Sequence, residues 1–220
     1  MITTVLFDMD GVLIDSEHLW RQAEKEVFTS LGAIWSEEIA DETAGKTTTA
    51  VTSLWYSLYP WQGVSLEEAE QKVIDRVAYL IKERGVRKEF VHETLTYLKA
   101  QHYKIGLATN SPRSLLNTAI DTLNLRIYFD TLVAVEDVTQ GKPAPDIYLK
   151  AAKNLGSTPS NCLVIEDSFT GATAGKKAGM TVVLTPDPTQ YHHPKFDFVD
   201  FKLHNLTYFQ DIVVPFLEKK

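Results

Sequence analysis

Short apolar runs rich in β-branched residues alternate with helical patterns along most of this chain. The runs occupy residues 4–7, 105–109, 132–135, 163–165 and 181–184. Helical patterns are found at residues 115–123, 146–155, 171–178 and 206–217, and Pro215 must kink or end the last of them. Near-continuous apolar runs of this length are typical of strands covered on both faces. We therefore predict an α/β fold with a doubly wound, Rossmann-like parallel sheet.

One region interrupts this alternation directly after the first apolar run. Between residues 16 and 84 there is no strand pattern, and three segments are amphipathic at helical spacing, namely residues 17–31, 48–59 and 66–84. We predict a helical cap domain formed by residues 16–85, inserted into a core domain formed by residues 1–15 and 86–220. An insertion at this point lies at the carboxyl end of a strand, where open parallel sheets bind their ligands.

The charge balance of the chain narrows its range of partners. With 220 residues and a net charge of −7, it lacks the excess of lysine and arginine on which nucleic-acid binding depends. No stretch approaches the roughly 20 apolar residues of a membrane span. The apolar N-terminal run has no basic flank, so we interpret it as a strand rather than a signal peptide. We expect a monomeric, cytoplasmic protein that binds neither nucleic acid nor membrane.

The strongest functional signal is a pair of carboxylates at the end of the first apolar run. Asp8 and Asp10 are two residues apart, and Gly11 follows them. Side chains two apart on a strand share a face, and a turn at Gly11 would direct both carboxylates into one crevice. Close carboxylates repel each other unless a cation joins them or one is protonated, which suggests Mg²⁺ and two separate chemical roles. A plain turn is the alternative, since Asp and Gly are common turn residues.

A second pair of acids ends another apolar run. Glu166 and Asp167 follow residues 163–165, and Ser168 comes next. These carboxylates could complete a metal site together with Asp8. The alternative is that Asp167 or Ser168 caps the helix that follows.

Two further signals at strand ends or in loops point to phosphate. Thr109 and Asn110 lie at a predicted strand-to-helix turn, where a hydroxyl, a side-chain amide and backbone N–H groups can bind a phosphate oxygen. Lys142, between Gly141 and Pro143, could neutralise a phosphoryl group and the crowded carboxylates. Taken alone, helix capping and a solvated lysine are the simpler interpretations. All four signals, however, lie on the carboxyl edge of one predicted sheet, and together they favour phosphate chemistry.

These four stretches, in this order, resemble the motifs of the haloacid-dehalogenase superfamily of phosphatases, in its branch of sugar phosphatases and β-phosphoglucomutase-like enzymes. The matching stretches are residues 7–17, 107–111, 141–146 and 164–168 with Gly171. The resemblance covers nearly the whole chain, and residues 16–85 lie where that branch carries its small helical cap. It implies a phosphoric monoester hydrolase that acts on sugar phosphates.

The resemblance also implies a role for each matched residue. Asp8 would attack phosphorus and form an aspartyl-phosphate, and Asp10 would protonate the leaving alcohol and then activate water. Thr109 and the backbone of Asn110 would hold phosphate oxygens, while Lys142 would steady the charge. These roles agree with the general need of phosphoryl transfer for positioning and charge neutralisation.

The cofactor that the resemblance implies is Mg²⁺. Asp8, the main-chain carbonyl of Asp10 and Asp167 would coordinate the ion, with Glu166 nearby and acting through water. Carboxylate and carbonyl oxygens are ligands that suit Mg²⁺.

The predicted cap should decide the substrate, because it would roof the crevice, and Lys46 could reach a substrate from there. Residues 45–47 look like the tail of a nucleotide-binding P-loop, but Ala40 stands where that loop needs glycine and no strand precedes it, so we reject this interpretation. The aromatic stretch 54–61 favours packing of a small helical core. Together with residues 14–17 it is also similar to bacterial enzymes that hydrolyse 2-deoxyglucose 6-phosphate and hexitol phosphates such as sorbitol 6-phosphate and mannitol 1-phosphate.

Two alternative functions are compatible with the same motifs. A β-phosphoglucomutase-type phosphomutase would transfer the phosphoryl group to a second hydroxyl rather than to water. That branch carries a histidine in the first cap helix where this chain has Trp20, and His18 lies on a different helical face. The other alternative is a catalytically idle phosphate-binding protein, against which the intact pair Asp8 and Asp10 argues.

Overall fold

A single parallel sheet forms the centre of the molecule. The computed structural model of the protein describes residues 1–43 and 46–218; Gly45, part of the rejected P-loop interpretation, lies outside them. Within these residues six strands pair in the order β3-β2-β1-β4-β5-β6, and all neighbours are parallel. The strands are β1 (Thr4–Phe7), β2 (Lys104–Ala108), β3 (Thr131–Val133), β4 (Cys162–Glu166), β5 (Thr181–Leu184) and β6 (Phe201–Lys202). The predicted parallel α/β sheet is confirmed.

Helices bury both faces of this sheet. The helices that cover it are α5 (Val91–Ala100), α6 (Arg113–Thr122), α7 (Asp146–Asn154) and α8 (Phe169–Lys177). Val5 and Phe7 of β1 belong to one buried apolar cluster with residues of α5 and α6, whereas Leu6 belongs to a second cluster with residues of α7 and α8. Successive side chains of a strand point to opposite faces, so β1 is covered on both sides, as the unbroken apolar runs predict.

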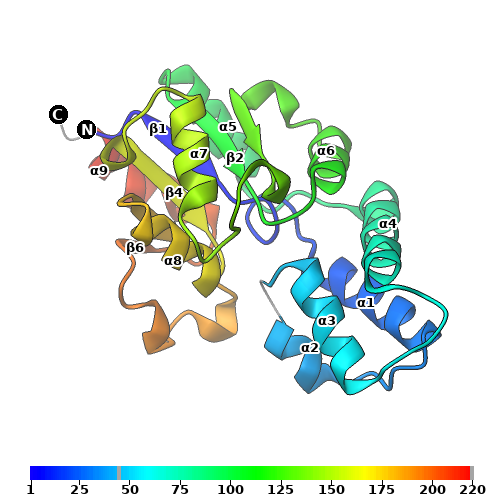
Figure 1. Ribbon diagram of the computed structural model, residues 1–220. Coiled ribbons are helices and arrows are strands. Elements are labelled where there is room, and N and C mark those ends of the chain that lie inside the picture. The colour runs from blue at the N-terminus through cyan, green and yellow to red at the C-terminus, as the bar shows by residue number, and fades with distance from the viewer. Residues whose placement is uncertain (44–45, 219–220) are drawn as a thin grey trace.

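The helices that follow β1 form a separate lobe beside the sheet (Figure 1). They are α1 (Glu17–Ser30), α2 (Glu37–Thr43), α3 (Thr48–Leu58) and α4 (Leu66–Arg84). Trp55 is the centre of this lobe: its ring stacks on Phe28 at a centroid distance of 5.5 Å and on Trp35 at 5.0 Å. Core packing of the aromatic stretch is therefore confirmed for Trp55 and Trp61, which are buried, whereas Tyr56 is exposed. The division into a core domain and a cap domain at residues 15/16 and 85/86 stays a prediction.

The two connections between the lobe and the sheet region run side by side. The backbone N–H of Asp15 donates to the carbonyl of Val86 at 3.0 Å, and that of Lys88 donates to Leu13 at 3.0 Å. Ile14 forms an antiparallel bridge with Arg87. The chain therefore leaves and rejoins the sheet region at one place.

Several elements differ from the sequence prediction. Helices α2 and α5 and strand β6 were not predicted, because α2 is short, β6 has two residues, and α5 starts after Phe90, which provides no side-chain cap. The closing segment is not one helix: a 3₁₀ turn and a π turn precede α9 (Val214–Leu217), which has Pro215 in its first turn. Proline is tolerated there because no backbone N–H is needed. Among the helices that the structure describes, none is both long and apolar enough to span a membrane.

Candidate active site

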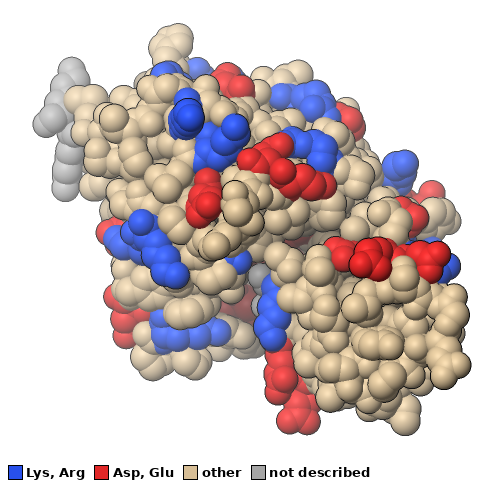
Figure 2. Space-filling view, in the orientation of Figure 1, with Lys and Arg blue, Asp and Glu red and all other residues tan. Residues whose placement is uncertain are grey.

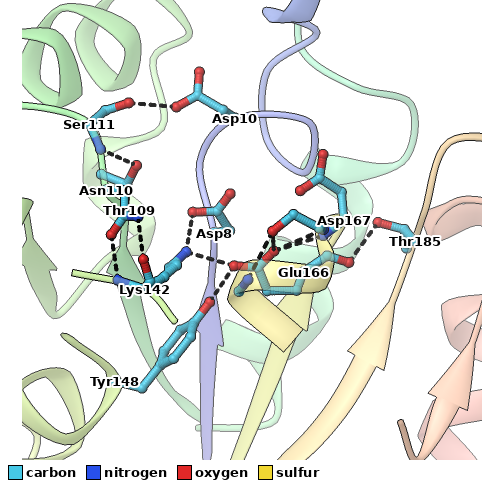
Figure 3. A network of polar contacts seen from close by, with 12 residues as sticks. Asp8, Asp10, Thr109, Asn110, Ser111, Lys142, Tyr148, Glu166, Asp167 and Thr185 are labelled. Atoms are coloured by element: carbon cyan, nitrogen blue, oxygen red, sulfur yellow. Dashed lines mark hydrogen bonds and ion pairs between the residues drawn. The ribbon is translucent and has the colours of Figure 1, made fainter. Parts of the chain in front are cut away.

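The residues predicted from the four motifs converge at the carboxyl edge of the sheet. Asp8 follows β1 directly, Thr109 follows β2, and Glu166 ends β4; β1 lies between the other two strands. Backbone hydrogen bonds continue the ladder into the site, since Asp8 N–H donates to Ile165 at 2.9 Å. Figure 3 shows these side chains directed toward one another. Sheet order thus brings together residues up to about 160 positions apart in the chain.

The site opens into a pocket of about 360 Å³ between the sheet edge and the helical lobe. Figure 2 shows the surface hollowed where the two parts meet. The residues that line the pocket and bear on its chemistry are Asp8, Asp10, Thr109, Asn110, Lys142 and Asp167 on the sheet side, and Trp20, Arg21, Glu24, Thr43, Lys46 and Thr48 on the lobe side. A concave site of this volume suits a small molecule.

The sheet side of the pocket, with Glu166 next to Lys142, forms its floor, and Lys142 is the buried cation there. Its Nζ lies 2.6 Å from Asp8 Oδ1 and 2.6 Å from Glu166 Oε1, and the residue is 7% exposed, so it is not the solvated lysine of the simpler interpretation. Burial acts to lower the pKa of Lys142, but the charges of Asp8 and Glu166 outweigh it and the net effect raises that pKa. The side chain is therefore a fixed ammonium group.

Glu166 is held by a full set of donors. Its Oε1 accepts from Lys142 and from the Tyr148 hydroxyl at 2.8 Å, and its Oε2 accepts from the backbone N–H groups of Asp167 and Ser168 and from the Ser168 hydroxyl. Burial would raise the pKa of Glu166, yet Lys142 and these hydrogen bonds lower it, so the group is ionised. Gly171 makes this possible, because a Cβ there would lie 1.6 Å from Glu166 Oε1. 

Ser168 also has the capping role considered for this turn. Its hydroxyl accepts from the backbone N–H of Gly171 at 3.0 Å, and it is the N-cap of α8. The helix cap and the acid pair are thus two functions of one turn, not competing interpretations.

Asp10 is held differently from Asp8. Its Oδ1 accepts from the Ser16 hydroxyl at 2.5 Å and from Trp20 Nε1 at 3.0 Å, and its Oδ2 accepts from the Ser111 hydroxyl at 2.8 Å. Asp10 thereby connects β1, the turn after β2 and helix α1 of the lobe. The chain turns directly after Asp10, at Gly11. This residue has a φ of 73°, and a side chain here would collide with Asp167.

Asp8 is a buried acid with opposing influences. Burial, together with the charges of Glu166 and Asp10, raises the pKa of Asp8 to about 7, against the lowering effect of Lys142. Asp8 and Asp10 therefore occupy distinct environments, one desolvated beside a lysine and the other surrounded by neutral donors. The raised pKa of Asp8 means that this acid needs additional positive charge nearby to be ionised at neutral pH.

Thr109 and Asn110 line the floor beside Lys142. Thr109 is buried, and its hydroxyl accepts from the backbone N–H of Ser111 at 3.0 Å. The side-chain amide of Asn110 clamps the backbone of Lys142: Nδ2 donates to the carbonyl at 3.2 Å, and Oδ1 accepts from the N–H at 2.8 Å. The amide positions the lysine loop, which leaves the backbone N–H of Asn110 as the group predicted to bind phosphate.

Three carboxylates of the site could share a cation. Oxygens of Asp8, Glu166 and Asp167 lie within 4.8 Å of one another. Burial, and then the charges of Glu166 and Asp8, raise the pKa of Asp167 well above its ordinary value, which expresses a shortage of positive charge. This all-oxygen donor set fits a hard divalent ion such as Mg²⁺. The main-chain carbonyl of Asp10 as a further ligand stays a prediction.

Lys46 stands apart from the other predicted residues. It lies on the lobe side of the pocket and is exposed. In the part of the chain that the structure describes, it forms no ion pair with them. Its role stays a prediction.

Sequence reasoning missed four contributors: Ser16, Ser111, Tyr148 and the contact made by Trp20. Ser16 and Ser111 lie inside the matched motif stretches, so their hydroxyls could have been considered. Tyr148 is 18 residues from its partner Glu166 and on a helix, where only the folded chain reveals the contact. Trp20 was compared with a histidine of other enzymes, but its hydrogen bond to Asp10 was not foreseen.

A parallel sheet with two separately held carboxylates, a buried lysine and an acid cluster that could hold a cation at its carboxyl edge suits an enzyme of phosphoryl transfer. Comparison with known proteins gives the family. Residues 2–179 match the haloacid dehalogenase-like hydrolases, and the chain belongs to this family. Hexitol phosphatase B of Escherichia coli is 39% identical over 208 residues, which cover 94% of this chain and 93% of that protein. The chain is accordingly a phosphoric monoester hydrolase.

Solved structures agree with the fold. CbbY from Rhodobacter sphaeroides in complex with phosphate superposes with a TM-score of 0.85 at 24% identity, covering 95% of this chain and 96% of that one. β-Phosphoglucomutase from Clostridium difficile has a TM-score of 0.83 at 21% identity, and 99% of each chain is covered. At these identities the likeness establishes the fold alone.

Proposed function

We propose that this enzyme is a Mg²⁺-dependent phosphatase of small sugar or sugar-alcohol phosphates, such as 2-deoxyglucose 6-phosphate, sorbitol 6-phosphate and mannitol 1-phosphate. The observation that carries the proposal is the separate holding of Asp8 and Asp10 around one pocket. The similarity to a hexitol phosphatase over almost the whole chain supports the substrate class. Monomeric state and cytoplasmic location stay predictions.

In the first step the Asp8 carboxylate attacks phosphorus, and the bond between phosphorus and the ester oxygen breaks. Asp10, in its protonated form, gives its proton to the departing alkoxide, which leaves as an alcohol. The product on the enzyme is an aspartyl-phosphate. Hydrogen bonds from Ser16, Trp20 and Ser111 fix the Asp10 carboxyl for this transfer.

In the second step a water molecule attacks the phosphorus of the aspartyl-phosphate. Asp10, now a carboxylate, takes the proton of this water, and the bond between phosphorus and Asp8 breaks. Inorganic phosphate is released, Asp8 is regenerated as a carboxylate, and Asp10 is again protonated. The same group thus acts as acid and then as base.

Charge is neutralised by the floor of the pocket. Lys142 stands beside Asp8, where its ammonium group can also face a phosphoryl oxygen. Thr109 and the backbone N–H of Asn110 complete the proposed phosphate cradle. Asp8, Asp167 and the main-chain carbonyl of Asp10 would hold Mg²⁺, with Glu166 acting through water; when bound, the ion supplies positive charge that offsets the carboxylates and the phosphoryl oxygens.

The test is phosphate release by the purified protein with Mg²⁺ from sorbitol 6-phosphate, mannitol 1-phosphate, 2-deoxyglucose 6-phosphate, fructose 1-phosphate, β-glucose 1-phosphate and phosphoglycolate. We expect release from the hexitol and hexose phosphates, abolished by chelator and restored by added Mg²⁺. Conversion of β-glucose 1-phosphate to the 6-phosphate without release would instead make the enzyme a mutase. Binding of phosphate without any reaction would support the alternative of a catalytically idle phosphate-binding protein.

A further inference from the structure

One buried acid of the pocket has no part in the proposed reaction. Glu24 lies on α1, one helical turn after Trp20, and is 9% exposed. It lines the same pocket as Asp8 and Asp10. Within residues 1–43 and 46–218, no group donates a hydrogen bond to its carboxylate. In contrast, Asp8 and Glu166 on the floor both bind Lys142.

Keeping Glu24 in this place has a cost. Burial raises the pKa of Glu24 to about 7, and Arg21 opposes this effect only in part. The guanidinium of Arg21 is already engaged, at 2.8 Å from Glu37 and 2.6 Å from Asp41. An apolar residue would stabilise a buried helix position better than a carboxyl group without a partner. The arrangement therefore indicates a partner that arrives with the ligand.

The surroundings of Glu24 suit hydroxyl groups rather than a second anion. The buried hydroxyls of Thr43 and Thr48 line the same side of the pocket. A carboxyl group accepts hydrogen bonds from hydroxyls when ionised, and can also donate one when protonated. A phosphate or carboxylate placed against Glu24 would meet like charge, because Arg21 beside it is already paired with Glu37 and Asp41 and Lys46 is exposed.

We propose that Glu24 is the residue through which the lobe recognises the hydroxyl groups of the substrate's carbon chain. The pocket then selects monophosphates whose carbon chain is uncharged and polyhydroxylated. It disfavours monophosphates whose chain lacks hydroxyls or carries a second anionic group. This inference rests on the proposed phosphatase function and adds the group that gives it specificity. Glu24 takes no part in phosphoryl transfer itself.

The experiment compares three monophosphates of the same carbon number. Sorbitol 6-phosphate carries hydroxyls along the chain, n-hexyl phosphate carries none, and 6-phosphogluconate carries a carboxylate at its far end. We measure kcat/KM for the wild-type enzyme and for Glu24→Leu and Glu24→Gln, with Glu26→Gln as a control. Glu26 is on the same helix but lies outside this pocket, where it binds Arg76. Thermal unfolding of every variant is recorded.

We expect Glu24→Leu to lower kcat/KM for sorbitol 6-phosphate by roughly 10- to 100-fold, mostly through KM, which corresponds to the loss of one or two hydrogen bonds to a charged group. Its kcat/KM for n-hexyl phosphate should change less than about twofold. Glu24→Gln keeps the shape and hydrogen-bonding capacity of the side chain. Its kcat/KM for sorbitol 6-phosphate should fall less than that of Glu24→Leu, and its kcat/KM for 6-phosphogluconate should rise. Glu26→Gln should leave kcat/KM unchanged for all three substrates.

Two results would overturn the inference. Equal losses on sorbitol 6-phosphate and n-hexyl phosphate would mean that Glu24 supports the fold or the chemistry rather than recognition. Unchanged values on both would mean that the ligand does not reach it. If Glu24→Leu fails to fold, the Gln variant decides between these outcomes. A wild-type enzyme that releases phosphate from none of the three would refute the proposed function instead, and the inference with it.

Discussion

The floor and the lobe side of the pocket satisfy their polar groups in opposite ways. On the floor, Lys142 and Glu166 are buried and their charged atoms contact oppositely charged or hydrogen-bonding partners of the protein. On the lobe side, Glu24 is buried, and none of the described residues donates a hydrogen bond to its carboxylate. The comparison separates a preorganised half, ready before substrate binds, from a half whose hydrogen-bonding capacity is left open.

This difference follows from the tasks of the two halves. Phosphoryl transfer needs charges fixed in advance, because reorganising them during the reaction would raise the barrier. Recognition of a carbon chain needs groups that exchange water for substrate. A floor whose lysine and glutamate are fixed can serve any phosphate ester, whereas Glu24 on the lobe side, which does not contact Asp8 or Asp10, can be altered without disturbing the chemistry.

The largest effect is expected from Asp8→Asn, which removes the nucleophile from the floor. Turnover should fall by at least about 10⁴-fold, the scale seen when a nucleophile is removed. The fold should persist, because asparagine has the same size and can still lie beside Lys142. Phosphate release and circular dichroism measure the two effects; substantial residual turnover would contradict the assignment of Asp8.

Next comes Lys142→Met, which leaves Asp8 and Glu166 buried without their cation. We expect the free energy of unfolding, measured by urea in the presence of chelator, to fall by about 3–5 kcal/mol, as when one partner of a buried ion pair is removed. The matched control is Lys176→Met, whose partner Asp200 is at the surface; its cost should be below about 1 kcal/mol. Similar costs for both variants would erase the distinction between a buried network and a surface pair.

The lobe side is tested by the pH dependence of stability in Glu24→Gln. Because the pKa of Glu24 is raised from 4.5 to about 7, the wild-type protein binds an extra proton on folding between these values. The contribution of Glu24 to the free energy of unfolding is therefore fully present below about pH 4.5 and declines as the pH rises to about 7. Across this pH interval the free energy of unfolding of the Gln variant should rise, relative to that of the wild type, by at most about 3 kcal/mol. Urea unfolding at pH 5 and pH 8 measures the gain, and an identical difference at both pH values would exclude a buried, uncompensated acid.

The smallest effect concerns the contact that joins the two halves. In Trp20→Phe, Asp10 loses one of three hydrogen bonds but keeps those from Ser16 and Ser111. We expect kcat for a sugar-alcohol phosphate to fall about tenfold, since a misaligned acid protonates a poor leaving group less well. Hydrolysis of p-nitrophenyl phosphate, whose leaving group needs no proton, should hardly change. Equal losses on both substrates would show that Trp20 does not act through Asp10.

The sequence was sufficient to predict the floor but not the lobe side. Asp8, Thr109 and Glu166 are each tied to the end of an apolar strand, and parallel strands bring their carboxyl ends to one edge. Their convergence therefore followed from the pattern alone. Glu24 carries no such signal, because an acid at one position of an amphipathic helix is ordinarily exposed, and its burial depends on how α1 packs in the lobe.

Contacts between distant elements were likewise beyond the sequence. The hydrogen bond from Tyr148 to Glu166 depends on where α7 crosses the sheet, and that from Trp20 to Asp10 depends on how the lobe sits over the sheet edge. Strand β6 was missed because two residues at a sheet edge leave no readable alternation.

The paired segments that connect the lobe to the sheet have a consequence for the evolution of new enzymes. Ile14 and Arg87 are bridged, so the two chain segments that flank the helical insert are neighbours. A foreign insert whose ends are similarly close could be grafted at the same two junctions without crossing or stretching the sheet. Recombination at two points could thus exchange the whole helical lobe in one event, and only the hydrogen bonds of Ser16 and Trp20 to Asp10 would have to be rebuilt.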